Sequence, residues 1–379
     1  MSETETFAIA TFVARWHSNV PHDLSGSDSE TLSLSELLEL AEPDDVARWS
    51  QLGFGYCDPR GAPWLRTAIA RRYGGIGSDE VLCCAGAQEA ITCVTASLLE
   101  PDDHAIVVLP IYQPSEQAVT RVCRTTGVPL EPDRWTLDLD RLAAAIEPTT
   151  KLVLANFPNS PTGATLDADM LRGLVTLCRR HGLWLVNDEI YRQTDDSPDH
   201  ARIPATADAY ERGISINGLS KGFGLPGLRV GWAACRDREL MVRALNTKST
   251  LSSCLSSPSE VLAHVALRAE GRIVERSRAI GRENHRRFSN LAIRYPDTFD
   301  VGAGNNLAFC FPRYVGPGSV DLFADRLARQ AGLLVLPSTL WRSTLAPVPV
   351  DHLRIGLGHA RGARGLDALD SHMSMRNVA

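Results

Sequence analysis

The sequence lacks several features that define whole classes of protein. No block of like charge stands out among its 39 lysines and arginines and its 45 aspartates and glutamates, so nucleic acid and anionic membranes are not expected as partners. No apolar run approaches the roughly 18 residues of a membrane span. The segment at residues 1–5 is acidic where a secretory signal would be basic. We therefore expect a cytoplasmic protein that acts on small molecules.

Cysteine pairs with metal-binding spacing are also missing. The nine cysteines are scattered without CxxC spacing, and an odd number in a chain without a signal fits reduced, mostly buried thiols. Cys83 and Cys84 are adjacent in a strand-like run, where successive side chains point to opposite faces and cannot easily share a ligand. No metal site is expected.

Short apolar runs alternate with helical patterns through the first two thirds of the chain, and the sequence has no internal repeat. The apolar runs lie at 80–84, 105–109, 151–156 and 183–188, and the helical patterns lie at 88–99, 116–124 and 170–180. Short buried strands separated by helices predict an α/β fold, with a mostly parallel sheet covered on both faces. Ligands of such sheets bind at the carboxyl ends of the strands.

The pattern changes after Ala234. Long helical stretches at 239–248 and 258–289 are followed by short strands around 306–311 and 353–357, with a helix at 320–331 between them. This order predicts a smaller α+β unit that is reached through a long connecting helix.

One lysine has the surroundings that a Schiff-base site needs. Ser220 precedes Lys221, several glycines follow it, and Arg229 stands eight positions on. A lysine that forms an imine with an aldehyde cofactor must lose its proton, so it belongs in an enclosed pocket with a cation near the cofactor's phosphate. The alternative is a solvated surface lysine in a glycine-rich loop.

The segment Ser220–Gly231 resembles the lysine motif of fold-type I pyridoxal 5'-phosphate (PLP) enzymes, the aspartate-aminotransferase superfamily. The resemblance extends from about Leu52 to Gly358. It implies PLP as cofactor, carried by Lys221, and a large domain with a mostly parallel seven-stranded sheet between helices plus a smaller α+β domain. The expected divisions are an N-terminal arm with part of the small domain at 1–48, the large domain at 49–250 and the C-terminal small domain at 251–379.

Asp188 and Tyr191 are the predicted catalytic partners of Lys221. Asp188 ends the apolar run at 183–187, and Tyr191 follows three residues later. A carboxylate against the pyridine nitrogen keeps that nitrogen protonated, which lets the ring accept the electrons left when a bond to the substrate's α-carbon breaks. Tyr191 can donate to the phenolic oxygen. An unaccompanied aspartate at this place would more often be a helix N-cap.

Other residues are candidates for holding the phosphate. Gly86, Ala87 and Gln88 follow a strand and open a helix, so their amides point at a bound anion. Arg229 offers a planar pair of donors, and Ser220 can add a hydroxyl. An ordinary strand-to-helix turn is the alternative at Gly86.

Two tyrosines match further positions of the family. Tyr112 matches the aromatic residue that stacks on the cofactor, although an isolated tyrosine would more often be a packing residue. Tyr56 matches the tyrosine that reaches the phosphate across a dimer interface. The resemblance therefore implies a homodimer with shared active sites.

The family motif Asn-Pro-Thr-Gly is changed in this chain. Ser160 holds the position of the asparagine that bonds the cofactor's phenolic oxygen, and Asn159 precedes it. A serine hydroxyl is shorter, so water or Tyr191 completes the bond, or Asn159 swings in. A cis bond before Pro161 is conceivable, because X-Pro bonds tolerate cis.

Substrate-binding residues are expected at both ends of the chain. Arg354 occupies the place of the family's arginine for the substrate carboxylate. Gly26, Asp28 and Glu30 lie in the loop that approaches the substrate side chain, where the two acids could receive a guanidinium or an amine. Solvated acids in a polar loop are the alternative.

Transamination between an amino acid and a 2-oxo acid is the expected reaction. The segments 156–158, 224–232 and 311–314 resemble the capreomycidine synthase branch of antibiotic pathways, which implies β-elimination and cyclisation, or an oxidase reaction, on an arginine-derived substrate as the alternative. A non-catalytic PLP-binding regulatory module is a third possibility.

Overall fold

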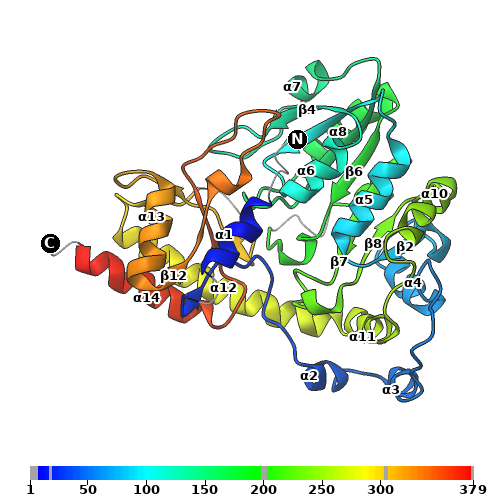
Figure 1. Ribbon diagram of the computed structural model, residues 1–379, viewed down its shortest axis with the longest axis horizontal. Helices are drawn as coiled ribbons and strands as arrows, with labels where there is room; N and C mark the ends of the chain where they lie inside the picture. Colours follow the sequence, from blue (N-terminus) through cyan, green and yellow to red (C-terminus); the bar gives the residue numbers. More distant parts are fainter. Residues whose placement is uncertain (1–6, 17–18, 198–202, 303–305, 377–379) are drawn as a thin grey trace.

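A seven-stranded sheet runs through the larger part of the molecule (Figure 1). The computed structural model describes residues 7–16, 19–197, 203–302 and 306–376, so the acidic segment at 1–5 lies outside it. The strand order is β2-β8-β7-β6-β5-β3-β4, and all strands are parallel except β8. Its strands are β2 (Val81–Cys84), β3 (His104–Leu109), β4 (Arg124–Pro129), β5 (Thr150–Asn156), β6 (Trp184–Asp188), β7 (Gly213–Gly218) and β8 (Gly231–Ala234).

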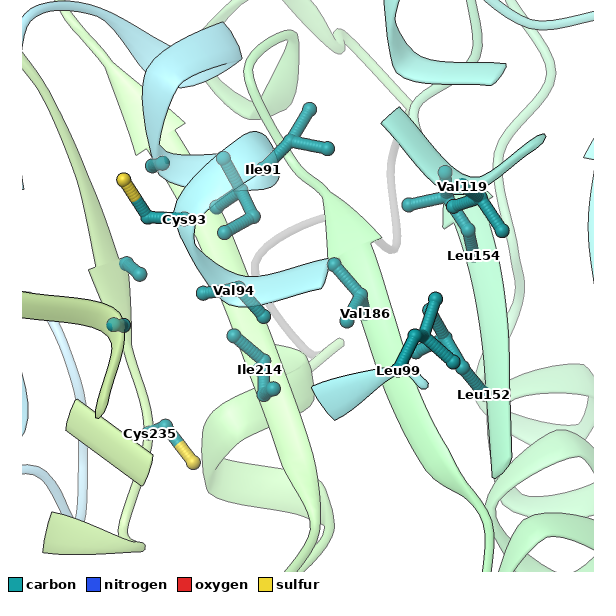
Figure 2. Close-up of a cluster of buried hydrophobic side chains, with 14 of the residues drawn as sticks. Ile91, Cys93, Val94, Leu99, Val119, Leu152, Leu154, Val186, Ile214 and Cys235 are labelled. Carbon is teal, nitrogen blue, oxygen red and sulfur yellow. The ribbon is translucent and has the colours of Figure 1, made fainter. Parts of the chain in front are cut away.

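Helices cover both faces of this sheet, which confirms the predicted fold class. On one face, α5 (Ala87–Leu98) and α10 (Arg238–Ser249) bury apolar side chains against the strands. Figure 2 shows Ile91 and Val94 of α5 pointing toward Val186 of β6 and Ile214 of β7. On the other face lie α7 (Leu139–Ala144) and α8 (Ala168–His181). Because water is excluded from both faces, polar groups can open to a ligand only at the strand ends.

A second unit is built around a separate apolar cluster. It contains α12 (Glu270–Arg294), α13 (Val320–Arg326) and α14 (Gly362–Arg376) with a three-stranded sheet, β10-β14-β13. Its short strands are β9 (Phe299–Asp300), β10 (Phe309–Cys310), β11 (Arg313–Tyr314), β12 (Leu333–Leu334), β13 (Leu336–Pro337) and β14 (Leu353–Gly356). The N-terminal strand β1 (His22–Asp23) pairs with β12, so the start of the chain joins this unit. The domain boundaries themselves stay a prediction.

The prediction of one long helical stretch at 258–289 is wrong, because two helices occupy these residues. The first, α11 (Ser257–Arg268), is separated from α12 (Glu270–Arg294) by Ala269. Every side chain from Glu260 to Leu267 is buried, since α11 packs with the large sheet, whereas α12 runs on toward the second unit (Figure 1). Because a single residue separates the two helices, the helical periodicity of the sequence continues across the break and does not reveal it.

The helix expected at 116–124 is displaced. It is α6 (Gln113–Thr120), and the chain from Arg124 onward forms the edge strand β4. The remaining helices are α1 (Ala8–Trp16), α2 (Leu34–Leu38), α3 (Pro43–Ser50), α4 (Pro63–Ala70) and α9 (Thr206–Ala209).

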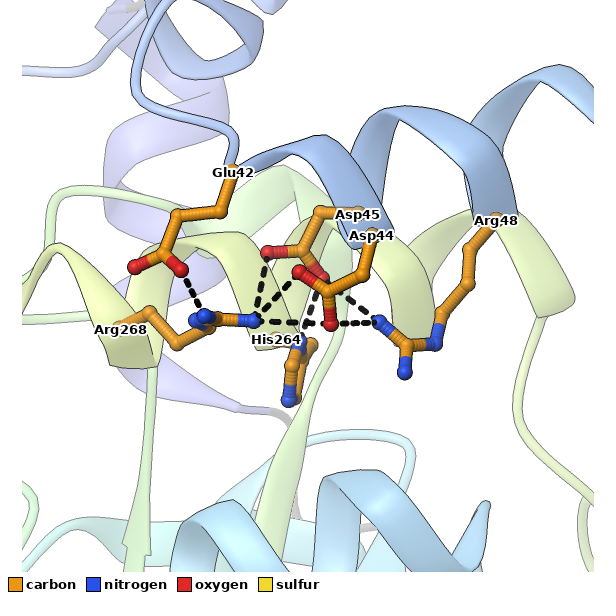
Figure 3. A network of polar contacts seen from close by, with 6 residues as sticks. All are labelled: Glu42, Asp44, Asp45, Arg48, His264 and Arg268. Carbon is orange, nitrogen blue, oxygen red and sulfur yellow. Dashed lines mark hydrogen bonds and ion pairs between the residues drawn. The ribbon is translucent and has the colours of Figure 1, made fainter.

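A charge network fixes α3 to α11 (Figure 3). The buried carboxylate of Asp45 lies 2.6 Å from Nδ1 of His264, 3.3 Å from Arg48 and 3.5 Å from Arg268. A buried carboxylate without such partners would be strongly destabilising. The network therefore holds the N-terminal segment against the large unit, and the last residue of α3 in the network, Arg48, lies eight residues before Tyr56.

Six of the nine cysteines are buried, and Cys57, Cys254 and Cys310 are partly buried. Cys83 and Cys84 point into different apolar clusters, as expected for neighbours on a strand. Burial raises the pKa of Cys178 and of Cys235 to about 12. Among the described residues, no helix is long and apolar enough to cross a membrane.

Candidate active site

The carboxyl ends of three parallel strands place the central residues of the site. Strand β6 ends at Asp188, Lys221 follows β7 by three residues, and Gly86 follows β2 by two. Because β2, β6 and β7 run in the same direction, these residues lie at one edge of the sheet.

Asp188 is buried at the end of β6. Its Oδ1 accepts a hydrogen bond from the N–H of Ile190 at 3.1 Å. Burial raises the pKa of Asp188 from 3.8 to about 7, although the Ile190 N–H and the positive charge of Lys221 oppose this shift. The carboxylate therefore lacks a counter-charge strong enough to keep it ionised, and a protonated ring nitrogen would supply one.

Ser27, which was not among the predicted site residues, lies between Lys221 and Tyr191. Oγ of Ser27 lies 2.9 Å from Nζ of Lys221 and 3.0 Å from the hydroxyl of Tyr191. The lysine ammonium also lies 5.6 Å from the centre of the Tyr191 ring. Ser27 thus holds the lysine amine above the buried tyrosine.

The start of α5 and the guanidinium of Arg229 lie side by side and together offer hydrogen-bond donors and positive charge to a phosphate. Gly86 has φ +100, and a Cβ there would lie 2.5 Å from Nη2 of Arg229. No side chain caps α5, which begins at Ala87, so its first N–H groups remain available to an anion. The side chain of Gln88 bonds instead to Pro114 and Ser115. Only the backbone of Gln88 can serve the anion.

Arg354 is poised for an anionic ligand. Its guanidinium is buried, donates to the carbonyl of Ser25 at 2.7 Å, and lies 4.8 Å from the ring centre of Trp341. Its Nε has no hydrogen-bond partner among the described residues. Burial lowers the pKa of Arg354. A buried cation with an unused donor is what a substrate carboxylate would satisfy.

Ser160 and Asn159 face different surroundings. Oγ of Ser160 lies 3.4 Å from Nη1 of Arg354. The amide of Asn159 donates to the carbonyls of Pro110 and Asn156, and its oxygen accepts from Thr162. The bond between Ser160 and Pro161 is cis. Any direct contact of Asn159 with the cofactor stays a prediction.

Asp28 and Glu30 both contact His359. Nε2 of His359 lies 3.3 Å from Asp28, and Nδ1 lies 3.7 Å from Glu30. Glu30 also accepts the N–H of Ala360 at 2.6 Å, so it anchors the loop. The sequence analysis missed His359, which follows the predicted Arg354 by five residues and belongs to no motif.

The backbone of this loop passes very close to glycines from elsewhere in the chain. A Cβ on Gly358 would lie 2.1 Å from the carbonyl oxygen of Asp28. A Cβ on Gly224 would lie 2.3 Å from the carbonyl oxygen of Glu30, and Gly224 has φ +64. Only glycine fits at these two positions, so the segment carrying Gly26 and Asp28 is clamped.

The two predicted aromatic residues differ in their placement. Tyr112 packs edge-on against Phe7 with 5.2 Å between ring centres and is partly exposed. Its pKa is raised, mainly by burial and also by Tyr191. Tyr56 is 94% exposed in the single chain, beside an equally exposed Phe54. The chain alone does not bring Tyr56 to the other site residues, and Ser220 lies half-buried beside Lys221.

Residues 16–361 match the family model described as aminotransferase class I and II. The chain belongs to this family. Its cofactor is therefore PLP, and the uncapped start of α5, Arg229 and the uncompensated Asp188 fit that cofactor. The protein is a PLP-dependent enzyme, either a transferase or a related cyclase, which sets aside the regulatory alternative.

Individual relatives in this aminotransferase family have different activities. Arginine–pyruvate transaminase AruH of Pseudomonas aeruginosa is 30% identical over 324 residues, which cover 80% of this chain and 77% of that one. Capreomycidine synthase of Streptomyces vinaceus is 29% identical over 93% of this chain and 89% of that one. A PLP-dependent aminotransferase structure from Streptococcus suis has a TM-score of 0.89 at 25% identity, with 99% of each chain covered.

Replacing Ser27 tests its contact with the lysine. A hydrogen bond to a charged group contributes about 1.5–3 kcal/mol, so Ser27→Ala is expected to lower kcat about tenfold or more. KM should change little, because the hydroxyl contacts the lysine. Steady-state kinetics measure both. Ser29→Ala is the matched control, since Ser29 contacts Lys221 only through its backbone N–H. A Ser27→Ala enzyme with unchanged kcat would contradict this role.

The raised pKa of Asp188 predicts a pH-dependent stability of the cofactor-free protein. Because the folded pKa lies above the unfolded one, stability is fully present below pH 3.8 and is lost as the pH rises through about 7. The loss is up to about 4 kcal/mol for three pKa units. Asp188→Asn cannot ionise, so its melting temperature should exceed that of the wild type increasingly between pH 4 and 8. Parallel melting curves would refute the buried charge.

Proposed function

We propose that this enzyme is an aminotransferase that moves the amino group of an amino acid to a 2-oxo acid. The observation that carries the proposal is that one loop contacts both Lys221, through Oγ of Ser27, and the buried Arg354, through the carbonyl of Ser25. Asp28 lies within electrostatic reach of both Lys221 and Arg354, so the two cations face the same space. Lys221 can act at the α-carbon while Arg354 binds the carboxylate, and this division of roles suits an α-amino acid.

The residues have distinct tasks in such a reaction. Bound PLP supplies an electron sink for the bond broken at the substrate's α-carbon. Arg354 binds the α-carboxylate, and Asp188 holds a proton on the ring nitrogen. Nζ of Lys221 would take the α-proton of the substrate and would then return a proton as a general acid. Ser27 keeps the amine over Tyr191 between these two steps.

The capreomycidine synthase type of reaction, elimination of a β-substituent followed by cyclisation, is the second candidate. Two observations favour it: the similarity to that enzyme extends over 93% of this chain, and Ser160 stands where aminotransferases have asparagine. A serine donates only one hydrogen bond, so it would hold the cofactor ring differently. An oxidase reaction and a role in natural-product biosynthesis belong to this alternative.

Product analysis separates the two reactions. Purified holoenzyme is incubated with a panel of amino acids, including arginine and hydroxyarginines, with and without pyruvate or 2-oxoglutarate, and products are identified by mass spectrometry. Transamination is expected to give a keto acid and the amine form of the cofactor. Lys221→Ala should reduce turnover at least 10³-fold, by the usual magnitude of acid–base catalysis. Ammonia or a cyclised product with unchanged cofactor would favour the second reaction.

We further propose a homodimer in which Tyr56 completes the phosphate site of the partner subunit. The exposure of the neighbouring side chains of Tyr56 and Phe54, 94% and 88%, supports this, because aromatic residues are enriched in protein–protein interfaces.

Mixing two inactive variants tests the shared site. Lys221→Ala and Tyr56→Ala homodimers should both be impaired, and subunit exchange should create mixed dimers with one intact site. Their activity should exceed the sum of the separate variants, and sedimentation should confirm a dimer. A mixture no more active than its components would show that each chain forms its own site.

A further inference from the structure

The loop at residues 25–30 contacts the two cations of the site in chain order, first Arg354 and then Lys221. The carbonyl of Ser25 accepts from Arg354 at 2.7 Å, and Oγ of Ser27 lies 2.9 Å from Lys221. Asp28 follows at once and keeps 23% of its side chain exposed. A substrate held by its carboxylate at Arg354, with its α-carbon near Lys221, therefore has Asp28 as the next group along the loop.

We propose that Asp28, held by His359, is the acceptor for a positively charged side chain of the amino-acid substrate. The substrate class is thus an amino acid with a distal guanidinium or ammonium group. This inference rests on the proposed function, because it assumes an amino acid bound at Lys221 and Arg354.

The charges around Asp28 support this assignment. Burial works to raise the pKa of Asp28, but the His359 hydrogen bond and the charge of Lys221 outweigh it, and the pKa is lowered. Asp28 is therefore ionised. Once the cofactor engages the amine of Lys221 and a substrate carboxylate engages Arg354, both of these cations have other partners. A cationic side chain restores the missing counter-charge.

Glu30 does not share this role. Its carboxylate accepts the N–H of Ala360 at 2.6 Å, and its backbone N–H donates to the carbonyl of Gly358 at 2.8 Å. Its carbonyl accepts from Arg276 at 3.2 Å. These bonds make Glu30 the anchor of the loop to the end of β14, while His359 acts as a positioning residue between Glu30 and Asp28.

Binding to a variant that cannot turn over tests the inference. PLP-loaded Lys221→Ala is titrated by calorimetry with two pairs of ligands of equal length, arginine against citrulline and lysine against 2-aminoheptanoic acid. The cationic member of at least one pair should bind about tenfold more tightly than its neutral partner, as expected for a partly desolvated charge pair.

Adding Asp28→Asn should abolish this ratio by weakening only the cationic ligand. Adding Asp102→Asn, which removes the same charge from an exposed loop before β3, should preserve it. The inference is overturned if neither cationic ligand is preferred, or if Asp28→Asn weakens both members of a pair equally. Failure of the proposed function is distinguishable, because the enzyme with intact Lys221 would then release no keto acid from any amino acid, whatever the binding ratios are.

Discussion

The burial of an acidic group at the end of a central strand is the constraint on which this site depends. Asp188 ends β6, with helices over both faces of the sheet, so water cannot stabilise its charge. A carboxylate in that position demands a cation, and the strand order brings Lys221 and Arg229 to the same edge. Under the proposed function, the cofactor's ring nitrogen supplies this cation, and Asp188 gains the counter-charge that the folded chain alone does not provide.

The rest of the site is assembled from segments that lie at opposite ends of the chain. Strand β1 pairs with β12, and the loop after it reaches Arg354 in β14 and Lys221 in the large unit. These contacts join the two units at the candidate site, so the proposed substrate would contact residues of both.

The fold and the central residues were accessible from sequence because they follow local rules. Apolar runs that stop at a polar residue gave β6 with Asp188 and β2 with Gly86. Strands β7 and β8 were not predicted, because Ser215 and Asn217 interrupt the apolar run of β7 and β8 contains no β-branched residue. Ser27 and His359 could not be found in this way, because their positions result from tertiary contacts between a loop and the end of β14, which leave no periodic trace.

Gly358 and Gly224 pack closely against the backbone of the loop at 25–30, so this packing fixes the position of the loop without the side chain of Asp28. Its backbone is fixed by carbonyl groups and glycines, whereas Asp28 projects a side chain that takes no part in that fit. A single replacement at residue 28 can therefore change the electrostatic character of the pocket while the scaffold stays where it is. Substrate preference can therefore change through single substitutions at this position that leave the fold intact.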